Sequence, residues 1–202
     1  GHNVTVFNRT KSKAEKWISE YKGNIADTPA EAAKDAEYIF TCVGNDNDLR
    51  EVTFGDNGAF KTIKKGAVYI DNTTASATIA REIYDYAKKN NFGALDAPVS
   101  GGQAGAENGA LTVMIGGDQS DFEKAEDKID CYSKKMKLLG KAGSGQLAKM
   151  VNQICIAGLV QGLSEAINFG MKAGLNMEDV IEVISKGAAQ SWQMENRYKT
   201  MI

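Results

Sequence analysis

Hydrophobic positions in the first 140 residues alternate between short β-branched runs and longer amphipathic stretches. The runs predict buried strands over Val4 to Phe7, Tyr38 to Val43, Ala67 to Ile70, Ala94 to Leu95, Leu111 to Ile115 and Lys137 to Leu139. Amphipathic stretches predict helices over Ser12 to Tyr21 and Ser76 to Asn90, and from Thr28 and Ser120 onward. Strands that alternate with helices are typical of βαβ units, so we predict a mostly parallel sheet.

Capping sequences mark three of these helix starts. Thr28-Pro29-Ala30-Glu31 combines a capping threonine, a proline at the first helical position and a glutamate that can reach back to the cap. Ser12 with Glu15, and Ser120 with Glu123, have the same spacing of hydroxyl and carboxylate. We therefore expect Ser12 and Ser120 to begin helices.

The pattern changes after Gly145, where β-rich alternation and proline both disappear. Apolar residues then recur every three to five positions, which predicts one helix from Gln146 to Ala173 with Gly174 as its C-cap. Shorter helices are expected over Met177 to Lys186 and Ser191 to Thr200. The predicted fold is α/β: a Rossmann-like parallel sheet domain over residues 1–142, then an all-α domain over 143–202 that begins with a long interdomain helix.

Composition narrows the function classes. The net charge is −2 and no basic stripe is visible, which argues against a nucleic-acid partner. The sequence shows no long uninterrupted apolar run, so we expect no membrane span. Cys42, Cys131 and Cys155 form no close pair, which favours a reducing, cytoplasmic setting. His2 is the only histidine, so histidine-based catalysis and most metal sites are disfavoured, and we assign no metal ligand.

The segment Asn8-Arg9-Thr10 follows the first predicted strand. At this point of a dinucleotide-binding sheet, NAD enzymes place a carboxylate that binds the adenosine ribose. An arginine and a hydroxyl would instead hold a 2′-phosphate, which favours NADP, with NAD still possible. The alternative is a polar turn without a ligand.

The glycine-rich turn expected before such a strand is missing, because the chain opens with Gly1-His2-Asn3. We interpret the sequence as part of a longer chain whose first strand, phosphate loop and first helix are not included. The alternative is a complete protein of an unrelated fold.

Two segments could hold a substrate. Asp96 to Gly102 follows a predicted strand, and Ser100, Gly101 and Gly102 could direct a hydroxyl and backbone N–H groups at a carboxylate. Lys149, Asn152 and Gln153 share one face of an otherwise apolar helix. Burial near a helix N-terminus would lower the pKa of a lysine toward the range useful for proton transfer. The alternatives are a flexible glycine loop and a lysine that reaches the surface.

Two further strand ends could line a cofactor. One is Asp71-Asn72-Thr73-Thr74, and the other runs from Val43 and Gly44 to Asp48.

The order of NRT, DNTTAS, DAPVSGG and GxGxxxKxxNQ resembles the β-hydroxyacid dehydrogenase family, which includes 3-hydroxyisobutyrate dehydrogenases. The resemblance implies NADP-dependent oxidation of a small β-hydroxyacid or reduction of its semialdehyde, with Lys149 as the general acid and base. It places the substrate carboxylate on Ser100, Gly101 and Gly102, and the substrate near Asn152 and Gln153. It also implies cofactor contacts, which fall on Asn8, Arg9, Thr10, Val43, Gly44, Asp48 and Thr74.

Other functions stay open at this point. A related imine reductase is one, although such enzymes usually replace the lysine, and a non-catalytic dinucleotide-binding module is another. The long helix is apolar around most of its circumference, so we also expect a homodimer or homotetramer.

Overall fold

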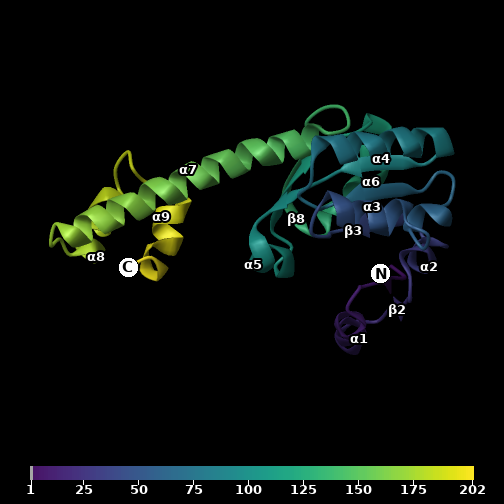
Figure 1. The fold of residues 1–202 in the computed structure, drawn as a ribbon, viewed down its shortest axis with the longest axis horizontal. Coiled ribbons are helices and arrows are strands. Elements are labelled where there is room, and N and C mark those ends of the chain that lie inside the picture. Colours follow the sequence, from purple (N-terminus) through teal and green to yellow (C-terminus); the bar gives the residue numbers. More distant parts are fainter. Residues whose placement is uncertain (1) are drawn as a thin grey trace. The chain divides into compact units, whose positions relative to one another are not determined.

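The protein was studied as a computed structural model that describes residues 2–202 (Figure 1). Contacts between residues divide it into one unit that ends at Lys149 and a second unit over Met150–Ile202. The division falls inside one helix, α7, which spans Ser144–Lys172.

A three-stranded parallel sheet forms the centre of the first unit. Its strands are β3 (Tyr38–Thr41), β4 (Val68–Asp71) and β5 (Gly93–Asp96), in that order. All four residues of β4 and of β5 are buried, as expected for parallel strands covered on both faces. The register pairs Asp71 with Asp96, so two carboxylates stand side by side at the carboxyl edge of the sheet.

Two further sheets, one of three strands and one of two, complete the described strands of this unit. In the first, β7 (Leu111–Ile115) lies between β6 (Val99–Ser100), which is antiparallel to it, and β8 (Ser133–Leu138), which is parallel. A single bridge between Asp96 and Gly116 connects the end of β5 to the end of β7. In the second, β1 (Thr5–Val6) pairs in parallel with β2 (Asn24–Ile25). The predicted strands are confirmed, although β8 begins at Ser133, earlier than the sequence indicated.

The helices of the first unit mostly follow the predicted amphipathic stretches. They are α1 (Lys11–Glu20), α2 (Pro29–Ala33), α3 (Asp46–Phe54), α4 (Ala77–Asn90), α5 (Gly102–Glu107) and α6 (Gln119–Asp130), with a 3₁₀ turn at Ala59–Lys61. The sequence did not predict α3 or α5. Asn45 caps α3 by accepting hydrogen bonds from the backbone N–H groups of Asn47 and Asp48.

The capping predictions had mixed outcomes. Thr28 accepts a hydrogen bond from the Glu31 N–H, as predicted, but the Glu31 carboxylate reaches the N–H of Asp27 rather than that of Thr28. The other two boxes were wrong: α1 begins after Thr10 and α6 after Asp118, and neither cap makes a side-chain hydrogen bond to the described helix. Ser12 therefore lies within the first turn, where its hydroxyl does not cap.

Two hydrophobic clusters cover opposite faces of the central sheet. Tyr69 contributes to one, and its strand neighbours Val68 and Ile70 contribute to the other, because side chains alternate along a strand. The first cluster also includes buried side chains of α3 and α4, among them Leu49, Ile79 and Ile83. The second includes Leu95, Ile115 and Ile129 from β5, β7 and α6. The carboxyl edge of the sheet is thus held between two packed layers.

The second unit contains most of α7, then α8 (Met177–Ile184), α9 (Trp192–Arg197) and a 3₁₀ turn at Tyr198–Thr200. Leu163, Ile167, Met177, Ile181 and Met194 form its buried cluster. α7 is continuous, as predicted, and Gly174 follows it with a φ of 76°, in the left-handed region (Figure 1).

One expectation about α7 needs correction. By length and composition the helix is apolar enough to cross a membrane, although the sequence appeared to lack such a run. A single helix of this kind is weak evidence for a span, because core helices of other proteins meet the same criterion.

The start of α7 approaches the sheet so closely that only glycine fits. A Cβ on Gly145 would lie 2.5 Å from the carbonyl oxygen of Asp96 and closer still to that of Met114. Backbone atoms of two strands cannot move aside as a flexible side chain would. The absence of a side chain at Gly145 is therefore what allows α7 to begin against β5 and β7.

We expect Gly145→Ala to lower the free energy of unfolding by about 1–3 kcal/mol, because the added methyl overpacks against backbone. Gly158→Ala is the matched control on the same helix, since a Cβ there meets nothing within 4 Å. Alanine has the higher helix propensity, so the control should gain up to about 1 kcal/mol. Thermal unfolding of both variants tests this, and equal melting temperatures would contradict it.

Candidate active site

Lys149 lies on α7, just after its first turn, and the residue is buried, with 7% of its surface exposed. The ammonium Nζ donates a hydrogen bond of 2.8 Å to the carbonyl oxygen of Val99. Burial lowers the pKa of Lys149 below its ordinary value, because removal from water disfavours the charged form. The amine therefore lies against the 98–102 segment and not in bulk solvent.

The segment after Val99 has a backbone that only glycine adopts readily. Ser100 ends β6, opposite Thr112, and α5 begins at Gly102. Gly101 has a φ of 140° and Gly102 a φ of 64°, both outside the range comfortable for other residues. Nothing lies within 4 Å of a Cβ built on Gly102, so the segment is open at that point. Positive φ values at two successive residues suit a concave turn that presents backbone N–H groups to an anion.

Asp96 is a buried carboxylate at the end of β5, and the sequence assigned it no role. Its Oδ1 accepts a hydrogen bond of 2.7 Å from the Gly143 N–H, and its Oδ2 one of 2.9 Å from the Gln146 N–H. Burial raises its pKa, and the hydrogen bonds from Gly143 and Gln146 partly oppose that rise. The carboxylate thus satisfies N–H groups at the start of α7 that have no partner within the helix.

Gln146 extends this connection to the end of β4. The side chain is fully buried; its Nε2 donates to the Thr73 carbonyl at 2.7 Å and its Oε1 accepts from the Ala75 N–H at 3.0 Å. These two backbone groups flank Thr74, which is exposed. Gln146 therefore fixes the loop that carries one of the residues expected to contact the cofactor.

Asp71, at the end of β4, has a different environment from Asp96. Its Oδ1 accepts hydrogen bonds from the Thr41 hydroxyl and the Thr73 N–H, whereas its buried Oδ2 has no partner among residues 2–202. Burial raises the pKa of Asp71 to about 6. The Thr73 hydroxyl in turn accepts from the Val43 N–H at 3.0 Å, which links the β4 loop to the β3 loop.

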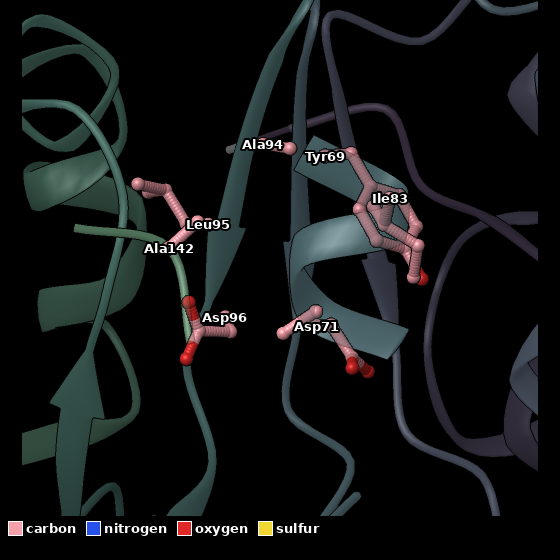
Figure 2. Close-up of a pocket in the computed structure, with 8 residues that line it drawn as sticks. Tyr69, Asp71, Ile83, Ala94, Leu95, Asp96 and Ala142 are labelled. Atoms are coloured by element: carbon pink, nitrogen blue, oxygen red, sulfur yellow. The ribbon is translucent and has the colours of Figure 1, made fainter. Parts of the chain in front are cut away.

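A small cavity of about 10 Å³ lies beside the two aspartates, with Tyr69, Ala94 and Ala142 in its wall (Figure 2). Figure 2 shows the carboxylate groups of Asp71 and Asp96 pointing away from each other. Such a volume holds about one water molecule, so this cavity is not the place of a cofactor or substrate.

The cofactor candidates near the first strand are exposed. The Asn8 side chain accepts a hydrogen bond from the Thr10 N–H, and the Arg9 guanidinium makes a 3.4 Å contact with Asp48. Arg9 is 86% exposed, so this ion pair contributes little to stability. A Cβ on Gly44 would lie 2.7 Å from Asp48 Oδ2, which brings the β3 loop beside the same carboxylate. Arg9, Asp48 and Gly44 are therefore neighbours.

Asn152 and Gln153 lie in the second unit. The amide of Asn152 donates to the Gln153 side-chain oxygen at 3.1 Å. Asn152 is partly buried and Gln153 is exposed. Their expected roles toward a substrate stay predictions.

Sequence reasoning identified Lys149 and the 100–102 turn, but it missed Asp96 and Gln146 as connecting residues. The available signal was weak: two aspartates each ended a predicted strand, and a glutamine followed the Gly143–Gly145 pair. Nothing in the sequence indicates that these side chains bond to backbone groups 47 to 73 positions away.

Comparisons with known proteins agree with this architecture. Residues 1–140 match the family model for the NAD-binding domain of 6-phosphogluconate dehydrogenase, and residues 143–202 match that for the NAD-binding region of NADP-dependent 3-hydroxyisobutyrate dehydrogenase. An uncharacterised oxidoreductase of Shewanella frigidimarina is 61% identical over the whole chain, which covers 69% of that protein. A probable mitochondrial 3-hydroxyisobutyrate dehydrogenase of Dictyostelium discoideum is 36% identical over 96% of the chain and 60% of its own length.

Solved structures give the same result. The 3-hydroxyisobutyrate dehydrogenase of Mycobacterium tuberculosis with L-serine superposes with a TM-score of 0.88 at 28% identity, over 97% of this chain and 66% of that one. An imine reductase of Myxococcus stipitatus in complex with NADP+ has a TM-score of 0.82 at 20% identity, over 92% of this chain and 63% of that one, and shares the fold. The chain therefore spans about two thirds of the length of the proteins that it matches.

We expect Asp71→Asn to stabilise the protein at neutral pH, because it removes a buried, half-satisfied charge. The folded pKa of about 6 lies above the ordinary 3.8. Asp71 thus costs stability above pH 6, and this cost disappears as the pH falls through 6 toward 3.8. The full difference corresponds to roughly 3 kcal/mol at 1.36 kcal/mol per pKa unit. The gain of the variant should therefore be largest near pH 7–8 and shrink toward pH 4 in parallel thermal unfolding series; a gain independent of pH would contradict it.

Proposed function

The chain belongs to the 3-hydroxyisobutyrate dehydrogenase family of NAD(P)-binding oxidoreductases, and from this membership we propose that it interconverts a small β-hydroxyacid and its semialdehyde. The proposed cofactor is NADP(H). The proposed substrates are of the 3-hydroxyisobutyrate, 2-hydroxy-3-oxopropionate, or glyoxylate and succinic semialdehyde class.

The observation that carries the proposal is the buried amine of Lys149 beside the glycine turn. Proton transfer at neutral pH needs an amine whose pKa has been lowered, and burial lowers that of Lys149. Within residues 2–202 the Lys149 amine makes one hydrogen bond, to the Val99 carbonyl, which leaves two of the three ammonium hydrogens available for a substrate oxygen. Lys149 would take the hydroxyl proton during oxidation and return it during reduction.

The substrate carboxylate would bind to Ser100, Gly101 and Gly102. The positive φ values of both glycines support this assignment, since they suit a turn whose N–H groups converge on an anion. The Mycobacterium tuberculosis relative was solved with L-serine, a small hydroxylated carboxylate. Asn152 and Gln153 would contact the rest of the substrate. The reaction then relies on holding the carbinol carbon in place while one proton moves.

The side chains that follow β1 suit NADP. Bound cofactor would supply the hydride acceptor, and the residues of this chain would hold and orient it. Arg9 has an exposed guanidinium whose ion pair with Asp48 is long, at 3.4 Å, and Thr10 has an exposed hydroxyl; together they suit a 2′-phosphate. Asn8, Asp48, Val43, Gly44 and Thr74 would line the remainder of the dinucleotide site.

We also propose an oligomeric state and a cellular location. α7 exposes Leu147, Val151, Ile154, Leu159, Phe169 and Met171, which supports our expectation of a homodimer or homotetramer. Cys42, Cys131 and Cys155 are all free and exposed, which suits a reducing cytoplasm. The division into domains over 1–142 and 143–202 stays a prediction.

We expect Lys149→Ala to lower kcat by about 10²–10⁴-fold, because proton transfer to and from the substrate oxygen is lost. Binding of NADP, measured by fluorescence of the reduced cofactor, should persist. Lys141→Ala is the matched control, because Lys141 is an exposed lysine shortly before α7. Turnover of the Lys149 variant at the rate of the control would exclude Lys149 as the acid and base.

We expect Arg9→Ala to lower kcat/KM for NADP about tenfold and to leave the value for NAD nearly unchanged, because only NADP carries the 2′-phosphate. Lys13→Ala, which removes a nearby exposed cation, should affect both cofactors alike. Steady-state kinetics with each cofactor checks this, and a parallel loss with both cofactors would argue against a phosphate contact at Arg9.

A further inference from the structure

Asp96 and Gln146 are buried, polar and unused by the proposed reaction. We propose that they are positioning residues: Asp96 holds the start of α7 so that the Lys149 amine stays on the Val99 carbonyl, and Gln146 ties this helix start to the loop that carries Thr74. The inference rests on the proposed role of Lys149 and adds the parts of the chain that place it.

The hydrogen bonds of Asp96 and Lys149, together with the backbone between them, form a closed ring that includes the Lys149 amine. One path runs along the backbone from Asp96 to Val99, whose carbonyl accepts the lysine. The other runs from the Asp96 carboxylate through the Gly143 and Gln146 N–H groups and along the first turn of α7 to Lys149. Asp96 is therefore connected to both partners of the Lys149–Val99 hydrogen bond: to Val99 through the backbone, and to Lys149 through the start of α7.

The part of this ring between Asp96 and Val99 is hydrogen-bonded to the sheet. The N–H and the carbonyl of Asp96 each bond to Gly116, at 3.0 and 2.8 Å, and Pro98 accepts from the Met114 N–H at 3.1 Å. The strand side of the ring is therefore rigid. Movement of Lys149 relative to Val99 then depends on the helix side, which is held by the two bonds of the carboxylate.

Gln146 connects the ring to the expected cofactor loops. Its amide bonds to the backbone on both sides of Thr74, at Thr73 and Ala75. The Thr73 hydroxyl then accepts from the Val43 N–H at the end of β3. The loops that follow β4 and β3 are therefore joined, the second through the first, to the helix of Lys149 by hydrogen bonds. This arrangement couples the position of the amine to the positions of the loops that are expected to contact the cofactor.

The identity of both side chains matters. A carboxylate offers two acceptors to two N–H donors, whereas an isosteric asparagine offers one acceptor and sets its NH₂ group against the other N–H. The glutamine must donate to one group and accept from another, which a carboxylate does only when protonated. A residue that merely fills space would not show these requirements.

Asp96→Asn tests the helix side of the ring. We expect kcat to fall about 10–100-fold, the range that a displacement on the order of 1 Å can cause, while KM for NADP changes little. Asp121→Asn is the matched control, because Asp121 is also 5% exposed but lies on α6. Equal kcat values for Asp96→Asn and its control would overturn the proposal.

A second readout does not depend on turnover. Reductive methylation of each lysine across a pH series, followed by peptide mass spectrometry, reports the pH at which each amine becomes reactive. In the unmodified protein the midpoint of Lys149 should lie below the ordinary value of a lysine, and in Asp96→Asn it should move up toward that value, because the released amine is more hydrated. An unchanged Lys149 midpoint would contradict the ring even if catalysis used another residue.

Gln146→Glu covers the case in which Asp96→Asn does not fold. The ionised glutamate would repel the Thr73 carbonyl, and the protonated one would restore the donor. Reduction of a semialdehyde should therefore be slow at pH 8 and recover toward the unsubstituted rate near pH 5–6, relative to Gln161→Glu, a control at an exposed glutamine farther along α7. The same loss at every pH would overturn the proposal.

Activity of Lys149→Ala would instead refute the proposed function and leave the methylation result valid.

Discussion

The carboxylate of Asp96, accepting hydrogen bonds from the Gly143 and Gln146 N–H groups, is the interaction on which the site geometry depends. A helix start leaves several N–H groups without partners, and burial makes each of them costly. A charged acceptor from the neighbouring strand satisfies two of these groups and sets the direction in which α7 leaves the sheet. The amine of Lys149 takes its place as a consequence of that direction.

The two strand-end aspartates show how neighbouring carboxylates acquire different properties. Asp96 and Asp71 are paired in register and similarly buried, yet the oxygens of Asp96 both accept backbone N–H bonds, whereas one oxygen of Asp71 accepts none from the described residues. Burial raises the pKa of each, and the hydrogen bonds act against that rise. Both oxygens of Asp96 therefore anchor the start of α7, while the pKa of Asp71 is raised to about 6.

Local sequence predicted the elements better than it predicted the connections between them. Alternation and periodicity located β3, β4, β7 and α7, because these segments bury continuous apolar faces. The box at Ser12 failed because the chain begins α1 earlier, after Thr10, and no local pattern decides between two adjacent polar starts. The contacts of Gln146 with Thr73 and Ala75 lie beyond any such reasoning, since they arise only once the strand register and the helix entry are both set.

The hydrogen bonds of Asp96 to the start of α7 also bear on the proton-transfer role proposed for Lys149. The chain has a single histidine, which lies far from the site in sequence. An amine is protonated at neutral pH unless its surroundings disfavour charge. At Lys149 burial supplies that effect. Because this burial depends on how α7 begins against the sheet, the lowered pKa of Lys149 comes from the helix start rather than from a charged partner residue.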